Sequence, residues 1–329
     1  MHPIVVRRLI PALLLLVAAS ESRAQDRLFL TEYQYENPKL KEMALDGTDP
    51  AELFDPPANE WLLVGLDFDA ASGLLYWAHG STPGTIRRAE PDGSGLELLV
   101  TGLKQPRGLA LDPTGGKIYW AAAPPSGNAL GLIQRANLDG SEVETFFELD
   151  PYDPVWSYVG PPTVDPTNGY VYFCAQNRII RKRTDGTGAI EVVVRGVTTV
   201  RGIDLDIANR RIYFLDANTN SDYFGRCDLD DTGFTVLYDL SPGVNVSSGL
   251  WDLVVDPDGG TAFWTDEIAH QVHRCNVDGT GFAEIYDSPP DLYPVGLSFD
   301  VAPTIPIADC NGNGTRDRDD IDGGISEDC

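Results

Sequence analysis

An aspartate followed by a turn residue recurs along this chain at nearly constant intervals, and this repeat limits the fold more than any other feature. The spacing averages about 46 residues, a length typical of a structure built from similar supersecondary units. Five of the six copies are Asp-Gly, a strong signal for a tight hairpin turn. The copies are Asp46-Gly47, Asp92-Gly93, Asp139-Gly140, Asp185-Gly186, Asp230-Asp231 and Asp278-Gly279.

Each unit has the same internal order, which is clearest in the unit at 106–149. Strand-like segments lie at 108–112, 117–120, 132–137 and 143–147, with turns or loops between them. Four strands in a unit of about 46 residues make one blade of a β-propeller. The repeat therefore predicts an all-β chain of four-stranded blades.

The two ends of the chain indicate how many blades there are. The last unit supplies only one strand, at 296–300, and the N-terminal part supplies three, at 28–31, 40–44 and 51–54. We expect a six-bladed propeller at 27–306, closed by a blade shared between the N- and C-terminal strands. Such closure leaves no free sheet edge between the first and last blades.

Residues 1–24 are typical of a secretory signal peptide. Arg7 and Arg8 precede an apolar run, and Ser22 and Ala24 place small residues before the cleavage point. The run is too short to span a bilayer, which takes roughly 20 residues. We expect no transmembrane segment and a secreted or cell-surface protein, periplasmic if the source is a Gram-negative bacterium.

The charge balance excludes one large class of partner. Lys and Arg number 24 against 50 Asp and Glu, a net charge of −26. Binding to nucleic acid depends on a basic footprint, which this chain lacks.

Three of the five cysteines, Cys174, Cys227 and Cys275, lie in strand-like segments. We expect them to be buried and unpaired, because equivalent places in neighbouring blades lie further apart than the roughly 4.4–6.8 Å between Cα atoms of a disulfide. Cys310 and Cys329 flank the C-terminal segment, and whether they pair stays open.

The expected second strands carry a shared motif. It reads Phe29-Leu-Thr-Glu32, Tyr76-Trp-Ala-His79, Tyr119-Trp-Ala-Ala122, Tyr172-Phe-Cys-Ala175, Tyr213-Phe-Leu-Asp216 and Phe263-Trp-Thr-Asp266. An arginine lies four residues before the turn aspartate in five units, at Arg88, Arg135, Arg181, Arg226 and Arg274.

This motif resembles the YWTD repeat of low-density lipoprotein receptor class B propellers. The resemblance implies that the aromatic pairs stack blade on blade and that the Asp and Arg residues form hydrogen-bonded networks between blades. Because only 263–266 keeps Trp-Thr-Asp, we expect fewer hydrogen bonds in these networks between blades. The cysteine-rich modules of animal receptors are absent, so receptor roles do not carry over.

The two faces of the ring should differ. Turns between first and second strands and between third and fourth strands lie on one side, the turn face, and they are short and alike. The other connections lie on the opposite side, the variable face, and range from Gln176-Asn177 to the long segment 149–160. Binding residues tend to lie on variable loops over a rigid base. We therefore place the working surface on the variable face.

Aromatic and basic residues gather in the connections of the variable face, and Trp, Tyr and Arg are frequent in binding hot spots. Arg107, Arg201 and Trp251 directly precede the innermost strands, at the expected mouth of the central channel. The alternative is that the aromatic residues only fill gaps between blades. The candidate ligand-binding residues are Trp61, Arg107, Trp156, Tyr158, Arg201, Trp251 and Tyr293.

A catalytic alternative exists, because six-bladed rings also include lactonases and related hydrolases with a metal ion in the central channel. Asp67 and Asp204 share one inward position, but the other four blades have no carboxylate there, which leaves an incomplete calcium cage. His270 and His273 have no nearby third ligand for zinc. The residues at the other four inward positions are Ala110, Thr163, Val254 and Ser298.

The C-terminal segment, 307–329, is acidic and has the spacing of a calcium-binding loop. Oxygen-bearing side chains fall at positions 1, 3, 5, 9 and 12, Thr315 offers its backbone carbonyl at position 7, and Gly314 lies at position 6, as in an EF-hand loop. The loop is similar to those of dockerins and thrombospondin type 3 repeats, although only the start of a second loop is present. The candidate Ca²⁺ ligands are Asp309, Asn311, Asn313, Thr315, Asp317 and Asp320.

Three functions fit these features. The first is a non-catalytic protein that binds a protein or glycan through the variable face and Ca²⁺ through its tail. The second is a calcium-dependent hydrolase or lactonase that uses Asp67 and Asp204. The third is a matrix component that assembles through its calcium-binding tail.

Overall fold

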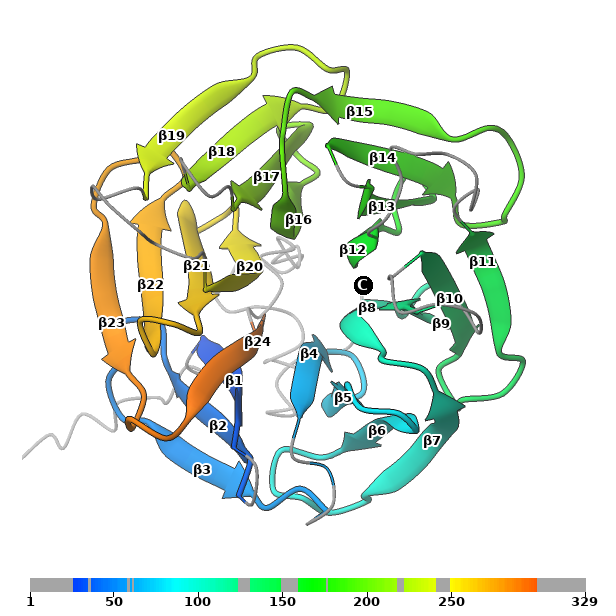
Figure 1. The fold of residues 1–329 in the computed structure, drawn as a ribbon, viewed down its shortest axis with the longest axis vertical. Helices are drawn as coiled ribbons and strands as arrows, with labels where there is room; N and C mark the ends of the chain where they lie inside the picture. The colour runs from blue at the N-terminus through cyan, green and yellow to red at the C-terminus, as the bar shows by residue number, and fades with distance from the viewer. Residues whose placement is uncertain are drawn as a thin grey trace, which may run out of the picture.

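The computed structural model describes residues 26–34, 37–57, 60, 62–123, 131–148, 159–175, 177–217, 222–240 and 249–300. These residues form 24 strands and no helix, so none of the described segments is a helix able to cross a membrane. The strands make six four-stranded antiparallel sheets around a central axis (Figure 1). The chain is therefore a six-bladed β-propeller, as the repeat predicts.

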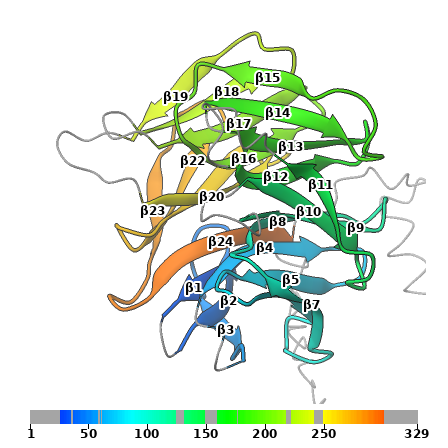
Figure 2. The same ribbon diagram turned by 45° about the vertical axis from the view of Figure 1, so that its right-hand side comes forward.

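Each blade runs from the axis to the outer rim (Figures 1 and 2). The innermost strands are β4 (Leu63–Asp69), β8 (Arg107–Asp112), β12 (Val159–Asp165), β16 (Val200–Asp206), β20 (Leu250–Asp256) and β24 (Tyr293–Asp300). The second strands are β1 (Arg27–Tyr33), β5 (Leu74–His79), β9 (Lys117–Ala122), β13 (Tyr170–Ala175), β17 (Arg211–Asp216) and β21 (Thr261–Asp266). The third strands are β2 (Lys39–Ala44), β6 (Gly84–Ala89), β10 (Leu132–Asn137), β14 (Arg178–Arg183), β18 (Tyr223–Asp228) and β22 (Gln271–Asn276). The outermost strands are β3 (Ala51–Phe54), β7 (Glu97–Leu103), β11 (Glu144–Glu148), β15 (Glu191–Arg195), β19 (Thr235–Asp239) and β23 (Ala283–Asp287).

The ring closes through a blade made from both ends of the propeller, as predicted. β24 pairs with β1 from Arg27 opposite Asp300 to Tyr33 opposite Tyr293. Figure 1 shows the orange β24 beside the blue β1. We call this sheet, β24-β1-β2-β3, the closing blade.

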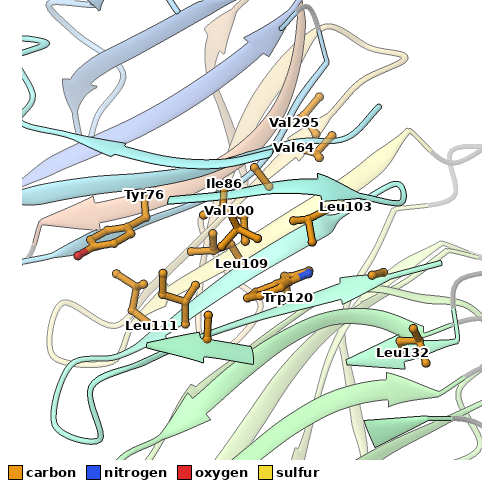
Figure 3. Close-up of a cluster of buried hydrophobic side chains, with 14 residues drawn as sticks. Val64, Tyr76, Ile86, Val100, Leu103, Leu109, Leu111, Trp120, Leu132 and Val295 are labelled. Atoms are coloured by element: carbon orange, nitrogen blue, oxygen red, sulfur yellow. The ribbon is translucent and has the colours of Figure 1, made fainter. Parts of the chain in front are cut away.

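The aromatic pairs of the second strands join each blade to both of its neighbours. Neighbouring residues of a strand point to opposite faces, so one member of the pair faces the following blade and the other faces the preceding one. Tyr76 of β5 and Trp120 of β9 share one buried cluster (Figure 3), and Tyr119 joins Phe173 of β13 in the next. The pattern recurs at all six seams, with Leu30 replacing one aromatic residue in the closing blade.

Arginine side chains tie blades together further from the axis. Arg88 of β6 donates to the carbonyl oxygen of Leu138 in the next blade (3.1 Å) and to Glu97 of its own blade (2.9 Å). Arg135 of β10 likewise donates to the carbonyl oxygen of Thr184. These contacts confirm the inter-blade role for both arginines, but their acceptor is a backbone carbonyl beside the turn aspartate and not the aspartate itself.

The turn aspartates that define the repeat hold the turns of the turn face. Each accepts the backbone N–H of the Ser or Thr two residues later, as Asp46 does from Thr48 (3.0 Å). The glycine of such a turn has a positive φ, and Gly47 also packs against the preceding blade. A Cβ atom on Gly47 would lie 1.8 Å from the carbonyl oxygen of Ile285.

Gly47→Ala should therefore destabilise the ring more than Gly73→Ala, a matched change at another positive φ. Gly73 (φ 73°) has open space around its Cβ position, so its replacement should cost about 1 kcal/mol of unfolding free energy from backbone strain alone. Gly47 (φ 82°) adds the clash with Ile285, and we expect a loss of roughly 3 kcal/mol or more. Urea unfolding followed by tryptophan fluorescence measures both, and equal losses would contradict the packing argument.

Candidate functional site

The axis of the ring holds a cavity of ≈170 Å³ between the innermost strands. Three carboxyl groups face it, from Asp67 on β4, Asp204 on β16 and Asp252 on β20. The hydroxyl groups of Thr163 and Ser298 complete its polar lining. Asp67 and Asp204 thus lie where the sequence places them, and Asp252 is an addition.

The three carboxylates join neighbouring blades through backbone N–H groups. Each Oδ1 accepts the N–H of the next residue in its own strand. Each Oδ2 accepts an N–H from the innermost strand of the next blade: Asp67 from Leu111 (2.8 Å), Asp204 from Val255 (2.7 Å) and Asp252 from Leu297 (3.0 Å). We call this set of bonds the carboxylate belt.

Two hydroxyl groups extend the belt to the preceding blades. Ser298 Oγ lies 3.2 Å from Asp67 Oδ1, and Thr163 Oγ1 lies 3.2 Å from Asp204 Oδ1. With them the belt crosses five of the six seams. At the sixth seam, between β8 and β12, Gly108 packs so closely on Pro161 that a Cβ atom would lie 2.2 Å from the proline ring.

Burial changes the protonation of the belt. The side chains border the cavity, which lies deep in the ring, and this desolvation raises the pKa of Asp67 to about 6. The pKa values of Asp204 and Asp252 are raised to about 7, mainly by desolvation and to a smaller extent by the nearby carboxylates, against the lowering effect of the N–H donors. All three groups therefore change charge between mildly acidic and neutral pH.

The belt bears directly on the hydrolase alternative. Both oxygens of Asp67 and Asp204 accept backbone hydrogen bonds, which is a structural use of these carboxylates. Among the residues that the structure describes, no group of three or more His, Cys, Asp or Glu side chains is arranged to hold a metal ion. The His270 ring packs at a tilt against Tyr293 (4.6 Å between ring centroids), whereas His273 packs between Trp264 and Phe282, so the two histidines have different surroundings.

The sequence does not predict Asp252 as a channel residue, because it lies in a bulge two residues before the inward position, where the other five blades have glycine or proline. Every innermost strand carries one extra residue opposite its partner near the variable face; in β20 the shift lies between Leu250 and Leu253. A bulge re-aims the side chains within it. Asp252 therefore reaches the cavity although Val254 holds the inward position that pairs with Phe263.

A smaller pocket of ≈20 Å³ lies at the mouth of the channel on the variable face, lined by Arg107, Arg201 and Trp251. Asp252 and Pro161 line both this pocket and the central cavity, so the two spaces adjoin. The Arg107 guanidinium lies over the Trp251 ring, 4.9 Å from its centroid. Because β8 and β20 stand on opposite sides of the ring (Figure 1), this pair crosses the channel mouth.

Glu267, directly after β21, holds the Trp251 side chain of this pair by a hydrogen bond. One oxygen of its carboxylate accepts from Trp251 Nε1, and the other accepts from the Tyr33 hydroxyl of the closing blade. Tyr33 in turn stacks on Tyr293 of β24, with ring centroids 4.8 Å apart. We call Tyr33, Arg107, Trp251, Glu267 and Tyr293 the mouth cluster.

The structure places some of the predicted residues and leaves others undescribed. Arg107, Arg201 and Trp251 lie at the channel mouth as expected. They belong to the innermost strands themselves and do not precede them, and Tyr293 likewise belongs to a strand and not to a connection. Tyr33 and Glu267 carry no sequence signal, because their contact joins residues far apart in the chain. The signal peptide, the calcium loop, Trp61, Trp156 and Tyr158 lie outside the described residues.

Cys174, Cys227 and Cys275 are buried and unpaired, which confirms the prediction for these three. Burial raises the pKa values of Cys227 and Cys275 to about 11, so both remain protonated thiols at neutral pH.

Comparison with known proteins agrees with the YWTD resemblance of the repeat. No family model matches the chain. It is 28% identical over 204 residues to low-density lipoprotein receptor-related protein 1 of Pyricularia oryzae, over 56% of this chain and 64% of that protein. It is 33% identical over 87 residues to nidogen-2 of Mus musculus, over 26% of this chain and 6% of that protein. The chain therefore spans less than two thirds of the length of either relative.

The fold also matches a chain of a solved nidogen/laminin complex. The TM-score is 0.66 at 20% identity, and the match covers 83% of this chain and 98% of the other. At this identity the likeness shows a shared propeller fold.

The belt predicts a pH-dependent stability. Because the pKa values of Asp67, Asp204 and Asp252 are higher in the folded chain than unfolded, folding favours proton uptake, and this contribution is lost as pH rises through about 6 to 7. The melting temperature should fall between pH 5 and 8. Asp252→Asn should flatten the profile, whereas Asp258→Asn, at an exposed site in the β20–β21 turn, should keep the wild-type slope. Parallel profiles for the two variants would contradict this assignment.

Proposed function

We propose that this protein is a secreted, non-catalytic binding module that recognises a protein or glycan ligand through the variable face of its propeller. The observation that carries this proposal is the mouth cluster. It presents Arg107 and Trp251 at the mouth of the channel, with Tyr293 stacked on Tyr33 beside them, and these are residue types that dominate binding hot spots. Four residues of the cluster lie in strands and Glu267 directly follows one, so the geometry of the cluster is set before a ligand arrives.

The contrast between the two faces supports the variable face as the binding surface. On the turn face, the five first-to-second turns within the chain each have four residues, held by the aspartate that ends the innermost strand. On the variable face, the corresponding connections differ in length from blade to blade. Uniform turns serve the scaffold, and variable connections can serve recognition.

A protein ligand is favoured over a glycan. The fold resembles that of a chain solved in a complex of nidogen with laminin, two proteins. The mouth cluster also crosses the ring from β8 to β20 and extends to the closing blade, which suits a ligand large enough to contact several blades.

The proposal extends to the two ends of the chain. The first 24 residues would direct export, and the loop at 309–320 would bind Ca²⁺ for attachment or assembly. The support is the residue pattern: the oxygen-bearing side chains fall at the EF-hand positions.

Peptide ligands selected from a display library on the wild-type protein should depend on the mouth cluster. Trp251→Ala should weaken their binding by about 30-fold, the loss typical of a hot-spot residue, and Arg107→Ala should act in the same direction. Arg183→Ala removes an exposed cation at the turn-face end of β14 and should leave affinity unchanged. Selected ligands that bind wild-type and Trp251→Ala proteins equally well would place recognition elsewhere.

Calorimetric calcium titration of the full chain tests the tail. Asp320→Asn removes the ligand at loop position 12 and should weaken binding by about tenfold or more. Asp319→Asn makes the same charge change at position 11, which carries no ligand, and should bind like the wild type. Tight binding that survives Asp320→Asn together with Asp309→Asn would direct attention to a site other than the tail.

A further inference from the structure

The pair Arg107 and Trp251 has an unusual position for two half-buried surface side chains. They come from blades on opposite sides of the ring and meet above the small pocket that adjoins the central cavity. Trp251 also packs against the buried cluster that contains Val64 and Val295. Figure 3 shows these two valines beside one another. The two side chains thus meet across the variable-face end of the channel.

A cation over an indole ring is held by a modest attraction, about 0.5–2 kcal/mol according to solvent exposure. This energy alone leaves a long arginine and a tryptophan free to separate, because ordering an arginine side chain costs a comparable amount. The pair therefore depends on a tryptophan that is already held in place.

Glu267 supplies that restraint. Its carboxylate accepts from Trp251 Nε1 and, with the other oxygen, from the Tyr33 hydroxyl. Burial and this hydrogen bond raise the pKa of Tyr33, so its hydroxyl stays protonated and remains a donor. Bonds to a charged acceptor are about twice as strong as neutral ones. One side chain thus fixes both the indole of blade β20–β23 and the tyrosine of the closing blade.

The position of Glu267 in the repeat is informative. It directly follows the second strand, and Tyr33 occupies the matching place in the closing blade. Of the other four blades, three have Gly80, Ala123 and Ala217 there, side chains too small to reach the channel mouth, and one has Gln176. Glu267 is thus the one carboxylate at this place of the repeat, and it belongs to the blade that carries Trp251.

We propose that Glu267 is a positioning residue that holds Trp251 across the channel mouth, so that Arg107 closes over it and forms a latch tied to the closing blade through Tyr33. The latch covers the central channel in the absence of a ligand. A ligand that enters the channel must first separate the pair, whereas a ligand that binds across the mouth meets the pair as it stands. This inference concerns the free protein and is tested without a ligand, so it stands or falls apart from the proposed binding function.

The test uses the full chain labelled with 5-fluorotryptophan and observed by ¹⁹F NMR. The Trp251 signal is assigned by its loss in Trp251→Phe, and its shift between H₂O and D₂O reports solvent exposure. In Glu267→Ala this solvent shift should increase, since an indole N–H without its acceptor no longer holds the ring in place. Glu267→Gln retains an amide oxygen for Trp251 Nε1 and should stay near the wild-type value.

Two further variants complete the design. Arg107→Ala removes the cover from the opposite blade and should also raise the solvent shift of Trp251. Glu284→Ala is the control, because Glu284 lies on β23 of the same blade and accepts from Gln271 away from the mouth. An unchanged Trp251 signal in both Glu267→Ala and Arg107→Ala would overturn the latch. A Glu267→Gln signal as exposed as that of Glu267→Ala would overturn the positioning role, and melting curves identify any variant that has lost its fold.

Discussion

The stacking of aromatic pairs between blades is the interaction on which the rest of this structure depends. A four-stranded blade has two faces, and each must be covered by a neighbour. The pair on the second strand, such as Tyr119 and Trp120, gives one large side chain to each face, and nearly every such side chain is fully buried. A stack built in this way has two uncovered ends unless it closes on itself. The pairing of β24 with β1 removes both ends at once, so the first and last segments of the propeller are held by the same seam.

Closure of the ring leaves backbone N–H groups of the innermost strands without a partner strand at the axis, and the carboxylate belt supplies acceptors for some of them. Each innermost strand is the edge of its sheet, and edge strands present backbone N–H groups without a partner strand. Buried N–H groups need acceptors, and in this ring Leu111, Val255 and Leu297 find them in aspartates of the preceding blades. An acidic channel can therefore arise from the hydrogen-bond demand of the backbone. The raised pKa values of these aspartates are the electrostatic consequence of meeting that demand in a buried place.

The sequence predicts the features that all six blades share, and few of the features that belong to one blade. The six blades, the closing blade and the place of Arg107, Arg201 and Trp251 follow from the period of the motif, because equivalent positions take equivalent places. Asp252 does not follow, since the other five blades have glycine or proline at its place in the repeat, two residues before the inward position. Glu267 does not follow either. Its role depends on a contact with Tyr33, which is 234 residues away in the chain, and no local sequence pattern predicts such a contact. Both residues occur in one blade only and lie near the axis, where side chains from all six blades come close to one another.

The channel mouth illustrates how a function can belong to the ring and to no single blade. Arg107 alone, on one blade, would be a solvated side chain at the start of a strand. The closed ring brings Trp251 of the opposite blade within 4.9 Å of it, and Tyr33 of the closing blade steadies Glu267 beside that tryptophan. The geometry of the mouth therefore requires three blades and the seam that closes the ring. A change that loosens the pairing of β24 with β1 should disturb Tyr33 and Tyr293 first, and through Glu267 it reaches the indole that Arg107 covers. Ring closure and the shape of the candidate binding surface are in this sense one structural property, because the same side chains take part in both.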